Sequence, residues 1–228
     1  MSPTGIIRSY QRKKSYLQAA LILPLLLTFL LSSTPACESK TPRPTNWAKP
    51  ITLAGVSNLY KVSDQLYRSA QPTAKGFAEL EKLGVRTVIN LREEKSDKEE
   101  LTGTNLKYYE IPSKATVVKE KDLLQFLKII SNSAEGPYLV HCHHGADRTG
   151  LFVAIYRIVV QGWSKEEAIL EMQKGGFGFH NTYTNLVKYL KTFDPEKFRR
   201  ALKNGEAQDI SLLSRQLILI WSQEVLNS

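Results

Sequence analysis

The segment YLVHCHHGADRTGLFVAIYRIVVQ, residues 138–161, decides the fold because it joins two strongly patterned elements through one short loop. Residues 138–142 are apolar or β-branched and predict a strand, whereas residues 148–161 are apolar on almost every side and predict a buried helix. The loop between them begins at Cys142, the second of the two cysteines, and the segment holds three of the four histidines. A strand that passes into a buried helix in this way is typical of an α/β fold.

A metal site is the first alternative for such a concentration of cysteine and histidine. Zinc ligands are normally spaced so that their side chains converge, as in C-x-x-C or H-x-x-x-H. Here the candidate ligands are contiguous, and neighbours in a strand such as His141 and Cys142 point to opposite faces. Only the distant His180 could add to them. We therefore expect no metal in this segment.

The pattern of the remaining chain predicts an α/β domain over residues 51–193, with a central sheet of about four to five strands flanked by helices. Ser164 and Glu167 form a capping box at the start of one helix, and residues 194–228 predict a helical C-terminal extension. Further strands are expected at 59–62, 66–69, 87–91 and 107–111, and further helices at 73–83, 123–130 and 164–175.

The first 36 residues are typical of an export segment. Four basic residues lie before the first acidic residue, Glu38, and account for +4 of the net charge of +9. An apolar run over residues 19–31 and a small-residue site at 34–36 follow, which together predict a signal peptide. A membrane anchor through residues 15–36, or a lipidated Cys37, is the alternative. Each outcome places the domain outside the cytoplasm, in the periplasm or facing it.

Two further features bound the function. Residues 37–50 hold three prolines between polar residues and predict an extended linker. Outside the leader the charge excess is moderate and forms no dense basic stripe, which argues against a nucleic-acid partner.

The loop from Cys142 to Thr149 has the composition of an anion site. A loop that enters a helix can turn its backbone N–H groups inward, and the helix N-terminus adds partial positive charge. A cysteine that faces such a cradle loses its proton readily. Arg148 supplies a planar fork suited to a phosphoryl group. The alternative for Cys142 is a small buried side chain without a chemical role, and the alternative for Arg148 is a structural ion pair at the start of the helix.

The pattern H-C-x5-R-T formed by His141, Cys142, Arg148 and Thr149 resembles the phosphate loop of the cysteine-dependent phosphatases, in their compact dual-specificity branch. The similarity extends to NLYKVSDQLYRSAQP and through GPYLVHCHHGADRTGLFVAIYRIVVQGWSKEEAILEMQKGGFG, so that it covers much of residues 58–178. It implies the compact dual-specificity phosphatase fold and a protein tyrosine phosphatase that hydrolyses phosphomonoesters. It implies neither a metal nor an organic cofactor.

The resemblance also implies the role of each loop residue. Cys142 would attack phosphorus and form a phosphocysteine, Arg148 would hold the equatorial oxygens, and Thr149 would hydrogen-bond the sulfur. His141 would orient the loop from behind, and Arg68 is either a support for the loop or one half of a structural ion pair. The expected phosphate-binding residues are His143, His144, Gly145, Ala146, Asp147 and Arg148, with Asp147 bracing the loop through local N–H groups.

The general acid of the family is an aspartate on a loop upstream of the cysteine, and this sequence lacks it. No aspartate lies between Pro112 and Lys121, and an ungapped comparison sets Thr116 at the position of the acid. Either Glu120 or Asp122 takes over, or catalysis proceeds without a strong acid. We expect the second case, because both carboxylates lie where a helix is expected to begin.

The substrate is less constrained than the chemistry. A phosphotyrosine protein is the expected partner. Loops that end in x-D-R-T-G also resemble those of phosphoinositide-directed phosphatases, and two histidines beside the nucleophile suit highly anionic phosphates, so a phosphoinositide or inositol phosphate is the first alternative. The second is a phosphate-binding module that no longer turns over.

Overall fold

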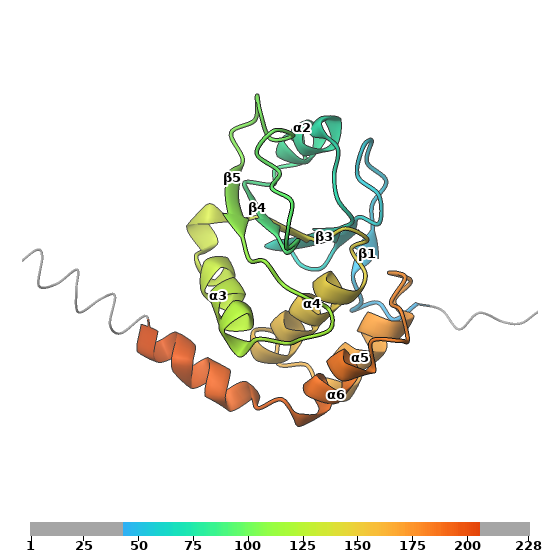
Figure 1. Cartoon of the computed structure of the whole chain (residues 1–228), viewed down its shortest axis with the longest axis vertical. Coiled ribbons are helices and arrows are strands. Elements are labelled where there is room, and N and C mark those ends of the chain that lie inside the picture. The colour runs from blue at the N-terminus through green and yellow to red at the C-terminus, as the bar shows by residue number, and fades with distance from the viewer. Residues whose placement is uncertain (1–42, 206–228) are drawn as a thin grey trace, which may run out of the picture. The chain divides into compact units, whose positions relative to one another are not determined.

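The parallel strands predicted from the apolar runs form the centre of one mixed sheet. We describe it from a computed structural model in which residues 43–205 are described (Figure 1). Six strands lie in the order β1-β2-β3-β6-β4-β5, and all pairings from β3 to β5 are parallel. The strands are β1 (Lys49–Pro50), β2 (Tyr60–Lys61), β3 (Leu66–Ser69), β4 (Thr87–Asn90), β5 (Lys107–Glu110) and β6 (Tyr138–His141).

The count exceeds the expected four to five strands because of β1, a two-residue strand that pairs antiparallel with β2. A strand of two residues is too short to give an apolar pattern in the sequence, so it was not predicted.

Helices cover both faces of the sheet, which explains why β3, β4 and β6 are buried along their whole length. In Figure 1, α2 lies on one side and α3 to α6 lie on the other. The helices are α2 (Ala74–Lys82), α3 (Glu120–Ser131), the short 3₁₀ helix η1 (Ser133–Glu135), α4 (Asp147–Val159), α5 (Lys165–Lys174) and α6 (Thr184–Thr192), and residues 195–205 are also helical.

The alternation of side chains in β6 fixes where the functional residues point. Tyr138 and Val140 pack in the cluster that contains α3 to α6, whereas Leu139 packs in the cluster that contains α2. Continued by two positions, this period places Cys142 with the first cluster and His141 on the face of α2, where its ring lies 6.1 Å from that of Phe77.

Helix α4 is the central element of the fold, as its all-round apolar pattern predicts. Every residue of α4 except Arg148 is buried. Its one other charged residue beyond the first turn, Arg157, pairs with Glu171 of α5 through two hydrogen bonds of 2.7 and 2.8 Å. The capping box of α5 forms between Ser164 and Glu167 as expected.

The segment 43–50, expected to belong to a linker, packs instead against the domain. Arg43 donates hydrogen bonds to the carbonyls of Ala48 and Gly175, and the buried Ala48 donates its N–H to Glu171 Oε1 at 2.6 Å. Part of the segment predicted as a linker is thus in contact with the domain. The contacts with Gly175 and Glu171 join residues more than a hundred positions apart, which local composition does not indicate.

Several predictions lie outside the described residues. They are the leader over residues 1–36, the fate of Cys37, and the part of the C-terminal extension beyond residue 205. Within residues 43–205, no helix combines the length and the apolar character that crossing a membrane requires.

Candidate active site

The loop from Cys142 to Ala146 connects β6 to α4 and turns sharply at Gly145. This glycine has a φ of +67°, and a Cβ atom there would lie 2.4 Å from the carbonyl of Ser69. Only glycine allows both the positive φ and the close approach of the loop to the end of β3. The sequence therefore sets the path of the loop at this residue.

Cys142 is 3% exposed and lies in the wall of an open cleft of about 500 Å³. It is a free thiol. The cleft brings together four segments that are far apart in the sequence: the loop after β4, the connection from β5 to α3, the loop from β6 into α4, and the residue before α6. Its lining residues are Glu93, Ser113, Lys114, Ala115, Thr116, Cys142, His143, His144, Asp147, Arg148 and Tyr183.

Arg148 lines the same cleft and is held from one side. Its Nη1 donates to the backbone carbonyls of Leu91 and Ser113, at 3.2 Å each. Within residues 43–205, its Nε and Nη2 groups have no hydrogen-bond partner. The guanidinium is thus oriented by two loops while part of its fork stays available for an oxyanion.

Thr149 is fully buried, and its hydroxyl has no hydrogen-bond partner among the described residues. The hydrogen bond expected between this hydroxyl and the sulfur of Cys142 is therefore not formed in this structure. A buried hydroxyl without a partner costs free energy, typically about 1–3 kcal/mol. Thr149 directly follows Arg148 in the first turn of α4.

We expected Asp147 to brace its own loop, but its carboxylate binds a different partner. Its two carboxylate oxygens lie 2.8 Å from the backbone nitrogen and from Nδ1 of His180. The side chain therefore ties the start of α4 to the segment that follows α5. The expectation failed because the partner residue comes from 33 positions away.

Arg68 supports the loop from inside the protein. It is 1% exposed, and its Nη2 donates to the carbonyls of Gly145 and Ala146 at 2.7 and 3.4 Å. Its guanidinium carbon lies 3.6 Å from the ring centroid of Phe177. Burial lowers the pKa of Arg68 to about 10, against the opposing effect of the charges on Glu171 and Cys142. Of its two expected roles, the contacts agree with support of the loop.

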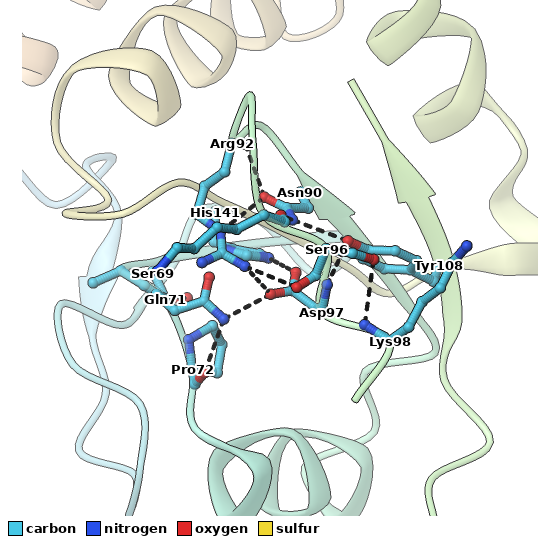
Figure 2. Close-up of polar contacts among 12 residues, drawn as sticks. Ser69, Gln71, Pro72, Asn90, Arg92, Ser96, Asp97, Lys98, Tyr108 and His141 are labelled. Atoms are coloured by element: carbon cyan, nitrogen blue, oxygen red, sulfur yellow. Dashed lines mark hydrogen bonds and ion pairs between the residues drawn. The ribbon is translucent and has the colours of Figure 1, made fainter. Parts of the chain in front are cut away.

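Next to Cys142, His141 takes part in a buried polar network that the sequence did not reveal (Figure 2). His141 Nε2 lies 2.9 Å from Asp97 Oδ2, and both side chains are fully buried. The other oxygen of Asp97 accepts from Gln71 and Arg92, at 2.7 and 2.5 Å. Burial by itself raises the pKa of Asp97, but His141, Gln71 and Arg92 outweigh it and lower the pKa.

Asp97 was missed because it lies in the charged stretch EEKSDKEE, where every carboxylate reads as a solvated surface group. The network continues through Tyr108, whose hydroxyl accepts from the amide of Asn90 and from the backbone nitrogen of Asp97, at 2.9 Å each. It joins the last residues of β4 and β6 to Tyr108 of β5, next to the loop that begins at Cys142.

The two loop histidines lie at the mouth of the cleft. The rings of His143 and His144 meet edge to face with centroids 4.5 Å apart, and that of His180 lies 5.9 Å from His144. Both loop residues are exposed. Their backbones are fixed, since the carbonyls accept from Gln71 N–H at 3.1 Å and from the Asn58 side chain at 2.9 Å.

Neither of the carboxylates considered as general acid lines the cleft. Glu120 lies 2.5 Å from Lys197 and lines a separate hollow beside Phe198. Asp122 lines a separate, very small cavity, to which Lys114 and Arg148 also contribute. Thr116 does line the cleft, as do Lys114 and Glu93, which form an ion pair of 3.1 Å.

A cysteine and an arginine that are separated by five loop residues, set between a parallel strand and a buried helix, define the phosphate loop of a phosphatase. The chain belongs to the tyrosine phosphatase family, whose model matches residues 54–210.

Among its relatives, the chain is 39% identical to the dual specificity protein phosphatase TpbA of Pseudomonas aeruginosa (strain UCBPP-PA14) over 188 residues, which are 82% of this chain and 85% of that protein. It is 31% identical to the inositol diphosphatase DSP3 of Arabidopsis thaliana over 159 residues, 66% and 76% of the two chains. Its fold matches the crystal structure of a cysteine-to-serine variant of P. aeruginosa TpbA in complex with pTyr, with a TM-score of 0.65 and 38% identity over 72% of this chain and 99% of that one.

Proposed function

We propose that the protein hydrolyses phosphomonoesters through a phosphocysteine intermediate on Cys142. The observation that carries this proposal is the position of Cys142 in the same cleft as Arg148, whose guanidinium is held by two backbone carbonyls. The sulfur attacks phosphorus in line with the leaving oxygen. The N–H groups of the loop and Arg148 hold the three equatorial oxygens, where charge is spread in the transition state.

The supporting residues act on this step from three directions. Arg68 fixes the carbonyls of Gly145 and Ala146 from below. The pair of His141 and Asp97 holds the end of β6, one residue before the nucleophile. The hydroxyl of Thr149 is buried without a partner and is thereby available to the sulfur when it leaves phosphorus.

We propose a phosphotyrosine protein as the substrate. Support comes from the relative TpbA, named a dual specificity protein phosphatase, and from the complex of its variant with pTyr. An inositol phosphate is the second candidate, because the mouth of the cleft carries His143, His144 and Lys114, and because several relatives are named inositol diphosphatases.

We also propose that the phosphatase acts outside the cytoplasm, either free in the periplasm or attached to the membrane. The support is the composition of residues 1–36 and the position of Cys37. A fusion of residues 1–40 to a reporter that is active only after export should give signal, and a silent reporter with normal expression would refute export.

The proposed chemistry is tested with the single substitution Cys142→Ser. Turnover of a phosphotyrosine peptide should fall at least ~1000-fold, because a serine hydroxyl is not ionised at neutral pH, while binding of the peptide persists. Retention of a tenth of the wild-type rate would refute the covalent step. Parallel assays with phosphoserine peptide, phosphoinositide and inositol phosphate decide the substrate class, and activity on none of them would leave only a phosphate-binding module.

A further inference from the structure

The leaving oxygen needs a proton donor. The aspartate that serves as the donor in the family is absent from the corresponding stretch of this sequence. In an in-line displacement, the leaving oxygen lies opposite the sulfur and therefore toward the mouth of the cleft. The connection from β5 to α3 forms one wall there through Ser113, Lys114, Ala115 and Thr116. Threonine at the position of the acid cannot protonate a leaving group at neutral pH.

The wall is fixed on both sides of Lys114. The carbonyl of Ser113 accepts from Arg148 at 3.2 Å, and the carbonyl of Ala115 accepts from Asn185 Nδ2 at 2.8 Å. The backbone of Lys114 is thus held between the residue that binds the phosphoryl group and the start of α6. Its Nζ lies 3.1 Å from Glu93 Oε1, and the two side chains are 53% and 41% exposed. The ammonium is therefore at the mouth, in contact with water.

Besides Lys114, the titratable side chains that line the cleft are Glu93, Cys142, His143, His144, Asp147, Arg148 and Tyr183, and several of them are engaged by other groups. The carboxylate of Glu93 is paired with the ammonium of Lys114. Asp147 is engaged by His180. The rings of His143 and His144 meet edge to face at the mouth of the cleft, and their backbone N–H groups belong to the cradle that would surround the equatorial oxygens.

We propose that Lys114, oriented by Glu93, is the catalytic residue that neutralises and protonates the leaving oxygen. A lysine ammonium and a tyrosine phenol have ordinary pKa values of about 10.4 and 10, so proton transfer between them is nearly balanced. The inference rests on the proposed phosphatase function.

The proposed step balances in both half-reactions. As the sulfur–phosphorus bond forms, the bond from phosphorus to the leaving oxygen breaks, and the leaving oxygen keeps the electron pair and takes a proton from Lys114 Nζ. Water then attacks the phosphocysteine and gives a proton to the neutral amine. The sulfur–phosphorus bond breaks, and the products are inorganic phosphate, the Cys142 thiolate and the Lys114 ammonium.

The test measures kcat/KM for the variant Lys114→Met on aryl phosphates whose leaving phenols differ in pKa. General acid catalysis matters in proportion to the basicity of the leaving group. We expect a loss of less than about fivefold for 4-nitrophenyl phosphate and of roughly 100-fold for phenyl phosphate and a phosphotyrosine peptide. Lys121→Met is the matched control, because Lys121 is an exposed lysine seven positions away that does not line the cleft; it should change neither rate.

Three results would overturn the assignment. The first is an equal loss on all leaving groups, which would leave Lys114 a role in binding alone. The second is a loss that depends on the leaving group in Glu93→Gln or His144→Asn but not in Lys114→Met, and the third is the same loss in Lys121→Met. A wild-type protein that hydrolyses none of these esters would instead refute the proposed function and this inference with it.

Discussion

Replacement of Arg68 by methionine should separate stability from catalysis. Arg68 is a fully buried cation whose hydrogen-bond acceptors are backbone carbonyls of the phosphate loop. Burial lowers its pKa to about 10, so the charged form is disfavoured in the folded protein. This depression corresponds to about 3 kcal/mol at neutral pH, where the side chain is charged in both the folded and the unfolded state.

The favourable contacts of Arg68 are of similar size. A hydrogen bond from a charged donor contributes about 1.5–3 kcal/mol, and the position over the ring of Phe177 at 3.6 Å contributes up to about 2 kcal/mol. Methionine removes both the cost and the contacts while it fills much of the space. We therefore expect Arg68→Met to change the free energy of unfolding by less than about 2 kcal/mol.

Catalysis should respond much more strongly. Without the Nη2 group, the carbonyls of Gly145 and Ala146 lose the donor that fixes the path of the loop. A displacement of about 1 Å in catalytic geometry can cost roughly 100-fold in rate. We expect kcat/KM to fall between about 30-fold and 100-fold, and we expect the pH at which Cys142 reacts with iodoacetamide to move upward, because a positive charge near the thiolate is lost.

The assays are urea unfolding, steady-state kinetics and the pH dependence of alkylation, each compared with Arg86→Met, which replaces an exposed arginine. A decrease in kcat/KM of less than threefold, with the alkylation profile unchanged, would refute the role in supporting the loop. A decrease of more than about 4 kcal/mol in the free energy of unfolding would refute the conclusion that the cost of burying Arg68 and its favourable contacts are of similar size.

Two further predictions concern residues around the loop. Asp97→Asn should destabilise the protein by about 3 kcal/mol at pH 7, because it breaks the buried ion pair with Arg92. The pKa of Asp97 is lowered in the folded state. The stabilisation is therefore present above about pH 4 and is lost as the pH falls further. Urea unfolding at pH 7 and pH 3 checks this, and a difference that does not shrink at pH 3 contradicts it. Gly145→Ala should abolish activity and destabilise the protein by at least about 1 kcal/mol, since φ is positive and the Cβ atom would lie 2.4 Å from Ser69. Gly162→Ala is its control, with a φ of +73° and open space around it; equal effects on activity would show that the contact with Ser69 is unimportant.

The local patterns of the sequence determined the core of the fold. Side chains alternate along a strand, so the run from Tyr138 to Cys142 indicated that His141 and Cys142 point to opposite faces. The all-round apolar pattern after Arg148 indicated a helix buried on every side. The capping box at Ser164 fixed the start of α5. Such signals depend on neighbours within about four positions and need no knowledge of the rest of the chain.

The same locality explains what the sequence indicated about the site. Cys142, Gly145 and Arg148 lie on one short loop, so their spacing alone brings the thiol, the backbone N–H groups and the guanidinium together. The spacing predicted the nucleophile and the arginine. It could not predict the fate of the Thr149 hydroxyl, because whether a buried group finds a partner depends on packing.

Tertiary structure alone decided the rest. Asp97 lies in a run of charges and Lys114 in a connection without periodicity, and both gain their roles from partners brought close by the parallel sheet, whose strand ends meet at one edge. Segment 43–50 looked like a linker because its proline and polar residues favour no local structure, yet Ala48 and Arg43 find partners on α5 and at its end. Contacts between residues that are distant in the chain depend on the fold as a whole, and local propensity does not predict them.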